Sequence, residues 1–447
     1  MGQHPRELDP LASPQSHFGA VLRSWRARRG LSLAQLGQLV HVSGDLLGKI
    51  EKAQRRALPD LVASLDMVLS ANGDLLSAAE RLDGHVGASR PTDAEVTRGR
   101  PLAQAGQRAR SRSLAPADVW AAARNWGFAA AHSLRSMGES SSKVTPPVSS
   151  TNLPVQMVQE RIQQLRHLDD VGGMDVLDWA INDLQWVQRM VDEHLRHSND
   201  PREVSLNGCV AQLSQLGGWL ACDAGAHEQA QTLWLVGLDA AVVAGDVRLG
   251  ATIVSCLSYQ ALWQGHPRHA LDLAVLACGA ARGLPGGAFQ ALLATRQARA
   301  RAQLGQEREC RRCLDDAQSF MEGGTDEDPG WVYWVSSAVL AADAGRALLE
   351  LGRPQAAIAG LTTGLRLFAD AQPRNRALHL TSLAEAYLLD GEISAAATHV
   401  DAAVDLAASS PSHRLRQRLS SLGSRLERTS CVPARTAADR IRCLLAA

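Results

Sequence analysis

The side chains best suited to recognition chemistry near the N-terminus lie in the stretch HVSGDLLGKIEKAQRR, residues 41–56. Asp45 could accept a hydrogen bond from a cytosine amine, and Lys49 could donate one to guanine. The side chain of Gly44 offers neither donor nor acceptor, so we expect few direct hydrogen bonds to bases. Hydroxyl, amide and cationic groups around this stretch could bind phosphate oxygens instead: Ser32, Gln35, Ser43, Lys52, Arg55 and Arg56.

Short helices must position these groups, and residues 16–83 show a helical pattern broken into five segments. Ser32, Ser43 and Asp74 are expected N-caps, and Pro59 fits a first helical turn. Helices should stop at Gly30 and Gly73. Apolar spacing should bury one face between the helices and expose another on the third helix: buried Leu36, Val40, Leu47 and Ile50, exposed Gly44, Asp45, Gly48 and Lys49.

Length and charge point to separate modules. A chain of 447 residues is too long for one compact core. Lys+Arg and Asp+Glu number 46 each, yet residues 1–150 hold 19 basic against 13 acidic side chains, which favours nucleic-acid contact at that end alone. Composition divides the chain into a disordered tail (1–15), a helical domain (16–83), a flexible basic linker with one short helix at 117–136 (84–154), and a long helical region (155–447).

A repeat of about 40 residues organises the long helical region. Its glycines fall 40, 40, 47 and 39 residues apart: Gly225, Gly265, Gly305, Gly352 and Gly391. Small residues recur five and twelve positions after each glycine and seven before it. Such residues let paired helices cross closely, which predicts an all-α protein ending in an α-solenoid of five repeats between about 205 and 410, with helical caps. A plain helical bundle, the alternative, would not require this shared register.

Both halves resemble known families. The first half resembles Cro/C1-type (XRE family) helix-turn-helix regulators through several residues in order: Leu22, Arg26, GLS at 30–32, Leu36, Val40, VS at 42–43, Leu47, IE at 50–51 and Pro59. The resemblance implies that Arg26 pairs with Glu51, and that Gly44, Asp45 and Lys49 touch base edges. His41 departs from the glycine usual at its position. LAEAYLLDGEISAAATHVDAA, residues 383–403, is similar to a tetratricopeptide (TPR) repeat, and the combination resembles regulators of high-GC bacteria.

The first helix of each solenoid pair should line a concave surface. The repeat register projects ten side chains onto that surface: Gln212, Gln215, Trp219, Asp223, Tyr259, Trp263, Arg299, Gln303, Arg346 and Glu350. Aromatic anchors beside arginines suit an extended peptide with a charged terminus or an acidic side chain. The alternative places the tryptophans in the core and leaves the solenoid only to dimerise.

An enzyme is not expected, because the sequence has no phosphate-binding glycine loop, no HExxH and no nucleophile with a spaced base. Cys310 and Cys313 form a CxxC that cannot complete a tetrahedral metal site alone, so neither metal nor cofactor is expected. The opening residues lack the apolar core of a signal peptide, and no apolar run could span a bilayer. We therefore expect a cytoplasmic protein without membrane contact.

These patterns predict a transcription regulator that binds a double-stranded DNA operator as a homodimer, because a two-part site would restore the selectivity that one monomer lacks. Its TPR-like domain would sense a peptide or protein ligand. The competing hypothesis is a protein-binding adaptor or anti-activator with a weak or vestigial DNA-binding domain, favoured by the glycines and by Asp45. The resemblance to regulators of high-GC bacteria implies control of development or secondary metabolism.

Overall fold

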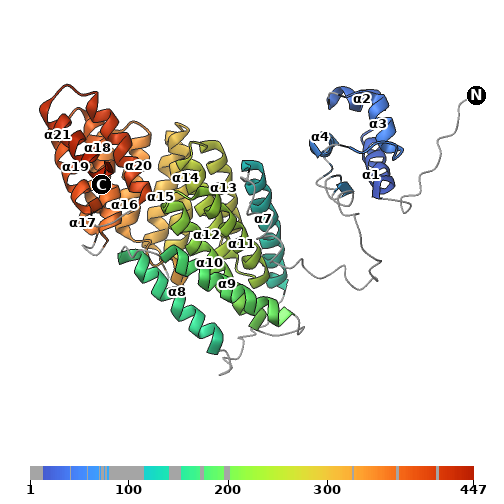
Figure 1. Cartoon of the computed structure of the whole chain (residues 1–447), viewed down its shortest axis with the longest axis horizontal. Helices are drawn as coiled ribbons and strands as arrows, with labels where there is room; N and C mark the ends of the chain where they lie inside the picture. Colours follow the sequence, from blue (N-terminus) through green and yellow to red (C-terminus); the bar gives the residue numbers. More distant parts are fainter. Residues whose placement is uncertain are drawn as a thin grey trace, which may run out of the picture. The chain divides into compact units, whose positions relative to one another are not determined.

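The computed structural model describes residues 14–40, 42–57, 59–69, 115–139, 153–171, 176–195, 202–324, 327–368, 372–408 and 412–446, with a few positions between 71 and 79. All regular secondary structure in these residues is helical (Figure 1), which confirms the predicted all-α fold class. The chain divides into two compact units, residues 1–99 and 100–447.

Among the described residues, the N-terminal unit has four helices: α1 (Pro14–Arg28), α2 (Leu33–Leu39), α3 (Gly44–Glu51) and α4 (Pro59–Leu69). α1 includes the last two residues of the expected tail, 14 and 15. Ser32 and Ser43 cap α2 and α3 as predicted, because each hydroxyl accepts a hydrogen bond from the backbone N–H three residues on at 3.2 Å. His41, most of the predicted fifth helix and residues 1–13 lie outside the described residues.

A buried ion pair fixes α1 against α3. The carboxylate of Glu51, a residue 3% exposed, accepts hydrogen bonds from Arg26 Nε at 2.6 Å and from Arg26 Nη2 at 2.9 Å. Arg26 Nη1 also donates to the Leu31 carbonyl at 2.9 Å. Two parallel hydrogen bonds set both distance and orientation, so the pairing implied by the family resemblance is confirmed. Apolar side chains complete this core: Phe18, Leu22, Leu36, Leu47, Ile50 and Leu65.

The second unit is built of helix pairs: α10 (Arg202–Asp223) with α11 (His227–Ala244), α12 (Val247–Trp263) with α13 (Pro267–Ala280), α14 (Gly287–Gln303) with α15 (Glu307–Glu322), α16 (Ser337–Glu350) with α17 (Pro354–Leu367), and α18 (Pro373–Asp390) with α19 (Ile393–Ala408). They are preceded by α8 (Leu153–Val171) and α9 (Val176–Leu195), and followed by α20 (His413–Glu427) and α21 (Val432–Ala446). Each first helix packs against its second helix and against the next pair, as in a solenoid.

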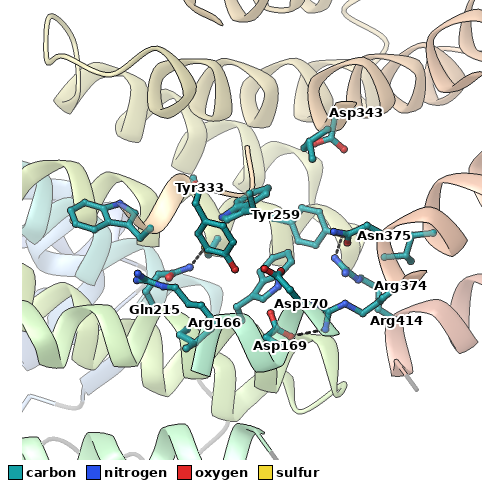
Figure 2. Close-up of a pocket in the computed structure, with 18 of the residues that line it drawn as sticks. Arg166, Asp169, Asp170, Gln215, Tyr259, Tyr333, Asp343, Arg374, Asn375 and Arg414 are labelled. Carbon is teal, nitrogen blue, oxygen red and sulfur yellow. Dashed lines mark hydrogen bonds and ion pairs between the residues drawn. The ribbon is translucent and has the colours of Figure 1, made fainter. Parts of the chain in front are cut away.

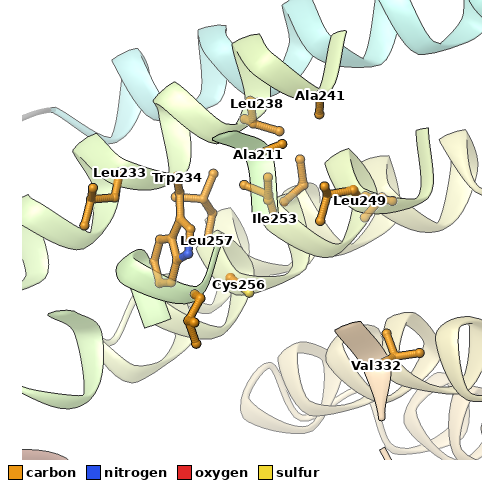
Figure 3. Close-up of a cluster of buried hydrophobic side chains, with 14 of the residues drawn as sticks. Ala211, Leu233, Trp234, Leu238, Ala241, Leu249, Ile253, Cys256, Leu257 and Val332 are labelled. Carbon is orange, nitrogen blue, oxygen red and sulfur yellow. The ribbon is translucent and has the colours of Figure 1, made fainter. Parts of the chain in front are cut away.

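The predicted turn glycines join the two helices of each pair. All five have left-handed backbone, with φ between 70° at Gly352 and 88° at Gly391, a conformation that favours glycine. Close crossing of the paired helices is also confirmed, because a Cβ on Gly345 would lie 2.7 Å from the backbone nitrogen of Leu361. In the first pairs the gaps are filled by the fully buried Trp234 with Leu238 and Leu257 (Figure 3).

The helix expected in the linker is α7 (Pro116–Glu139), which packs against α11, α12 and α13. Its buried residues are spaced by four, three and four positions, which forms an apolar stripe: Val119, Ala123, Trp126 and Ala130. The indole of Trp126 lies where any Cβ on Gly250 of α12 would collide with it. The expected helix at 117–136 is therefore confirmed, but the expectation of a flexible linker is wrong for this segment, because the helix packs on the solenoid.

The longest repeat contains an insertion, residues 327–336, between α15 and α16. It includes a 3-10 turn, η2 (Gly330–Val332), whose Val332 is buried. The carboxylate of Asp328 accepts hydrogen bonds at 2.9 Å from the backbone nitrogens of Ala288 and Phe289, at the start of α14. The longer spacing of 47 residues between Gly305 and Gly352 is thus explained by this insertion, which is hydrogen-bonded to the start of α14.

Candidate functional site

The exposed side of α3 carries one ion pair. Lys49 Nζ lies 2.8 Å from Asp45 Oδ2, and the two side chains are 50% and 75% exposed. The hydrogen bond from Lys49 lowers the pKa of Asp45, so the carboxylate is charged and offsets the lysine. The two predicted base-reading side chains therefore lie together, and each is partly occupied by the other before any DNA arrives.

The glycines of α3 pack against α2. A Cβ on Gly44 would lie 3.1 Å from the backbone nitrogen of Ala34, and one on Gly48 would lie 3.4 Å from Leu33 Cδ1. Gly44 is half-buried and Gly48 is buried. The expectation that Gly48 is on the exposed face is wrong, because α2 crosses α3 over these two positions. The glycines are explained by close helix packing, and the exposed side of α3 is left to Asp45 and Lys49.

The candidate phosphate-binding groups flank α2 and α3. Ser32 and Gln35 form a reciprocal cap, in which Gln35 Oε1 accepts from the Ser32 backbone nitrogen at 2.9 Å. Lys52, Arg55 and Arg56 are exposed immediately after α3. Cation side chains thus follow the helix that would enter a groove, and contact between these residues and DNA stays a prediction.

An inner cavity occupies the inner side of the solenoid (Figure 2). It is lined by side chains of the first helices α10, α12, α14, α16 and α18, together with α8, the insertion and α20. A side cavity adjoins it, and both are lined by Tyr259, Arg346 and Arg414. The first helices of successive pairs therefore contribute to one internal site.

The structure brings the ten predicted groove residues to these two cavities or directly behind their walls. Gln215, Trp219, Tyr259 and Arg346 line the inner cavity, whereas Tyr259, Trp263, Arg299, Gln303 and Arg346 line the side cavity. The remaining three each hold an arginine: Gln212 accepts from Arg166 at 3.1 Å, Asp223 lies 2.8 Å from Arg414, and Glu350 lies 2.5 Å from Arg299. Ligand binding by these residues stays a prediction.

Sequence reasoning missed several wall residues, which come from outside the first helices of the repeats. α8, expected to be a cap, supplies Arg166, Asp169 and Asp170, and the insertion supplies Trp331, Tyr333 and Trp334. Tyr333 hydrogen-bonds to Asp170, and Figure 2 labels both residues beside Arg166. The extra residues between Gly305 and Gly352, with the aromatic run GWVYW, were the available signal for the insertion.

Ion pairs join the two ends of the solenoid around the inner cavity. Arg374 Nη1 of α18 lies 2.7 Å from Asp169 of α8 and 3.5 Å from Asp223 of α10. Asp223 also pairs with Arg414 of α20. All four side chains are at most 14% exposed, so the charges attract one another with little screening by water. Helices about 200 residues apart in the sequence are thereby held together.

Four guanidinium groups surround the phenol of Tyr259. Arg414 Nη1 donates to its oxygen at 3.0 Å, and the guanidinium carbon of Arg296 lies 4.8 Å from its ring centre. Burial raises the pKa of Tyr259, but the charges of Arg414, Arg346, Arg299 and Arg296 together outweigh burial and lower the pKa to about 8. The electrostatic potential at this point of the cavity is therefore positive.

Two other arginines have too little counter-charge. Burial lowers the pKa of Arg166 to about 10. Burial, followed by the neighbouring charge of Arg346, lowers the pKa of Arg418 to about 9. Cys310 and Cys313, in contrast, are buried among alanines outside both cavities, and burial raises the pKa of Cys310 to about 11. An unreactive structural thiol has this environment.

Comparison with known proteins identifies the first unit. A family model described as a helix-turn-helix domain matches residues 17–79. Curated protein sequences give no match. A similar solved structure is PlcR from Bacillus thuringiensis in complex with the peptide PapR7 and DNA, at 11% identity and a TM-score of 0.31, covering 96% of this chain and 95% of that chain. Among the described helices, none has the length and apolar character needed to cross a bilayer. The family match and the capped α2–α3 pair together assign residues 17–79 to a helix-turn-helix domain, a fold typical of DNA-binding regulators.

Proposed function

We propose that this protein is a DNA-binding transcription regulator whose TPR-like solenoid senses a peptide or protein ligand. The observation that carries the proposal is the intact helix-turn-helix pair, with capped helices and exposed cations directly after α3, in the same chain as a solenoid with an internal cavity. DNA binding would place the protein in the cytoplasm, and control of development or secondary metabolism remains part of the proposal.

In this proposal α3 enters the major groove, where Asp45 and Lys49 reach base edges. Because only these two of the predicted base-facing side chains carry recognition groups, a single domain would discriminate weakly between sequences. Phosphate contacts from Lys52 and Arg55 would supply much of the affinity, which should therefore fall steeply as salt increases. A homodimer on a two-part operator would restore selectivity.

The first test is to recover the DNA bound by the full-length protein in cells and to measure its affinity for the recovered sites. Lys49→Ala and Arg55→Ala should each weaken binding and reduce the slope of log affinity against log salt by about one. Arg308→Ala, at an exposed position on α15, serves as the matched control for loss of one positive charge. Unchanged affinity in both helix-turn-helix variants would argue strongly against the proposal.

The adaptor hypothesis is the second candidate, and the Asp45–Lys49 ion pair favours it. A carboxylate on the exposed side of α3 repels phosphate and occupies the lysine. If the protein is an adaptor, no DNA site should be enriched among the DNA recovered with it from cells. A partner protein should instead copurify with the wild type and with both charge variants. Enriched sites that are lost in the variants would exclude an adaptor role as the main function.

A further inference from the structure

The wall of the inner cavity has more hydrogen-bond donors than its own acceptors satisfy. Arg166 is 4% exposed, and its Nη1 has no hydrogen-bond partner among the described residues. The Nε of Arg296 and the indole Nε1 of Trp331 are also buried and have no hydrogen-bond partner among the described residues. A buried donor without an acceptor is costly, so a ligand in this cavity should bring acceptor atoms.

Arg346 is the cation best placed to meet such a ligand. It lines both cavities, and it makes no hydrogen bond or ion pair with any residue that the structure describes. Its neighbours are already engaged: Arg299 pairs with Glu350, and Arg414 pairs with Asp223. The charge of Arg346 acts on Asp343, but that carboxylate already lies 3.5 Å from Arg296, so Arg346 has no ion-pair partner of its own among the described residues.

Tyr259 supplies a donor at the same point. Its oxygen accepts from Arg414, but its own hydroxyl proton has no acceptor among the residues described. An oxyanion placed between Arg346 and Tyr259 would receive hydrogen bonds from both. Charge-assisted hydrogen bonds of this kind are among the stronger polar interactions in proteins.

The balance of charge leads to the same conclusion. The two cavities are lined by seven arginines and three aspartates. Three more carboxylates lie behind the walls, and each is paired with one of those arginines: Asp223, Glu350 and Glu385. Burial raises the pKa of Asp170. The site is therefore short of negative charge.

Aromatic rings lie on the same cavity wall. Trp219 and Trp334 stack with ring centres 6.5 Å apart and an interplanar angle of 18°, and Trp219 lies 5.3 Å from Tyr259. All three rings line the inner cavity. They offer an aromatic, apolar surface beside the cations, which suits a ligand with an aromatic or aliphatic body.

We propose that the inner cavity binds an organic anion whose carboxylate or phosphate oxygens accept hydrogen bonds from Arg346 and Tyr259, while its apolar body lies against Trp219 and Trp334. The inference rests on the proposed ligand-sensing function of the solenoid and narrows its ligand class. The anionic group could belong to a peptide C-terminus or to a small metabolite, and the two sources are separated by the test.

The test uses isothermal titration calorimetry on the full-length protein with matched pairs of probes. The pairs are N-acetyltryptophan with its amide, a Trp-terminated tripeptide with its C-terminal amide, and phenyl phosphate with phenol. At least one anionic probe should bind with one-to-one stoichiometry and at least tenfold more tightly than its neutral counterpart. Preference for the tripeptide acid indicates a peptide source, and preference for a small anion indicates a metabolite. The proposal is overturned if no anion is preferred, or if inorganic phosphate binds as tightly as every organic anion.

Arg346→Gln separates a binding role from a structural one. The variant should bind the preferred anion at least tenfold more weakly and should no longer bind it more tightly than the neutral probe. Arg308→Gln should change neither affinity. The ligand-free thermal midpoint should stay constant or rise, because repulsion between Arg346 and Arg418 is removed. A lower midpoint with unchanged binding would contradict the proposal. Because operator affinity of the ligand-free protein is measured separately, failure here is distinguishable from failure of the DNA-binding proposal.

Discussion

Removing the positive partner of Glu51 should destabilise the helix-turn-helix domain more than any other single charge change on α1. In Arg26→Met, the carboxylate of Glu51 stays 3% exposed and loses both short hydrogen bonds. Breaking a buried pair from one side costs about 3–5 kcal/mol. We expect about 3 kcal/mol, at the low end of that range, because the Arg26 side chain is itself 18% exposed.

That loss is large for a domain of this size. Stabilities of roughly 0.05–0.15 kcal/mol per residue give about 3–10 kcal/mol for the span matched by the helix-turn-helix family. Hydrogen exchange of the α3 amides in the full-length protein would measure the change, since it reports local opening without interference from the solenoid helices. Operator binding should fall together with amide protection.

Two further variants test the reasoning. Arg23→Met removes a weaker partner, whose Nε lies 3.5 Å from Glu51 Oε2 and whose side chain is 34% exposed, so it should cost less than about 1 kcal/mol. Arg26→Met combined with Glu51→Leu removes both charges and should recover most of the loss. The reasoning is refuted if Arg26→Met costs no more than Arg23→Met, or if the double variant is as unstable as Arg26→Met alone.

The remaining predictions concern one backbone position, one exposed ion pair and one buried phenol. Ala53 has a φ of 57°, so Ala53→Gly should stabilise the N-terminal unit by about 1 kcal/mol, measured by the same exchange experiment. Asp45→Asn should release Lys49 and tighten DNA binding with a steeper salt dependence in fluorescence anisotropy; weaker binding would mean that Asp45 reads a base. Tyr259 should ionise near pH 8 by absorbance at 295 nm, in a step absent from Tyr259→Phe. Because this pKa is lower in the folded than in the unfolded protein, stability should rise between about pH 8 and 10 and fall again on acidification.

Local backbone requirements made parts of the fold predictable. The spacing of Gly225, Gly265 and the three equivalent glycines is visible in the sequence, because the left-handed turn inside each helix pair favours a residue without a Cβ. Ser32 and Ser43 were identified as caps for a similar reason, since the first turn of a helix needs an acceptor for its free N–H groups. Both features depend on a few neighbouring residues, so a single sequence contains enough information to find them.

Features that depend on three-dimensional arrangement were missed. The helical spacing of Gly48 places it on one side of α3, but spacing alone does not tell which side α2 will cover. The contact between Asp169 and Arg374 spans 205 residues and depends on how the whole solenoid curves. The repeat register found the cavity residues of the first helices, whereas it gave no information about α8 or about the insertion that carries Trp334.

The buried arginines of the solenoid are difficult to explain by stability alone. A buried ion pair loses hydration that its Coulomb attraction barely offsets, and apolar residues of similar volume are often as stabilising or more so. The other helix crossings of this solenoid use such residues, as the packing of Trp234 and Leu257 illustrates. Folding therefore does not require the half-buried Arg346, which has no ion-pair partner among the described residues, or the buried Arg418, whose pKa is lowered to about 9 by burial and by the like charge of Arg346. Residues that weaken the free protein at a cavity are expected where a ligand later supplies the missing charge, which is why the stability of Arg346→Gln is as informative as its binding.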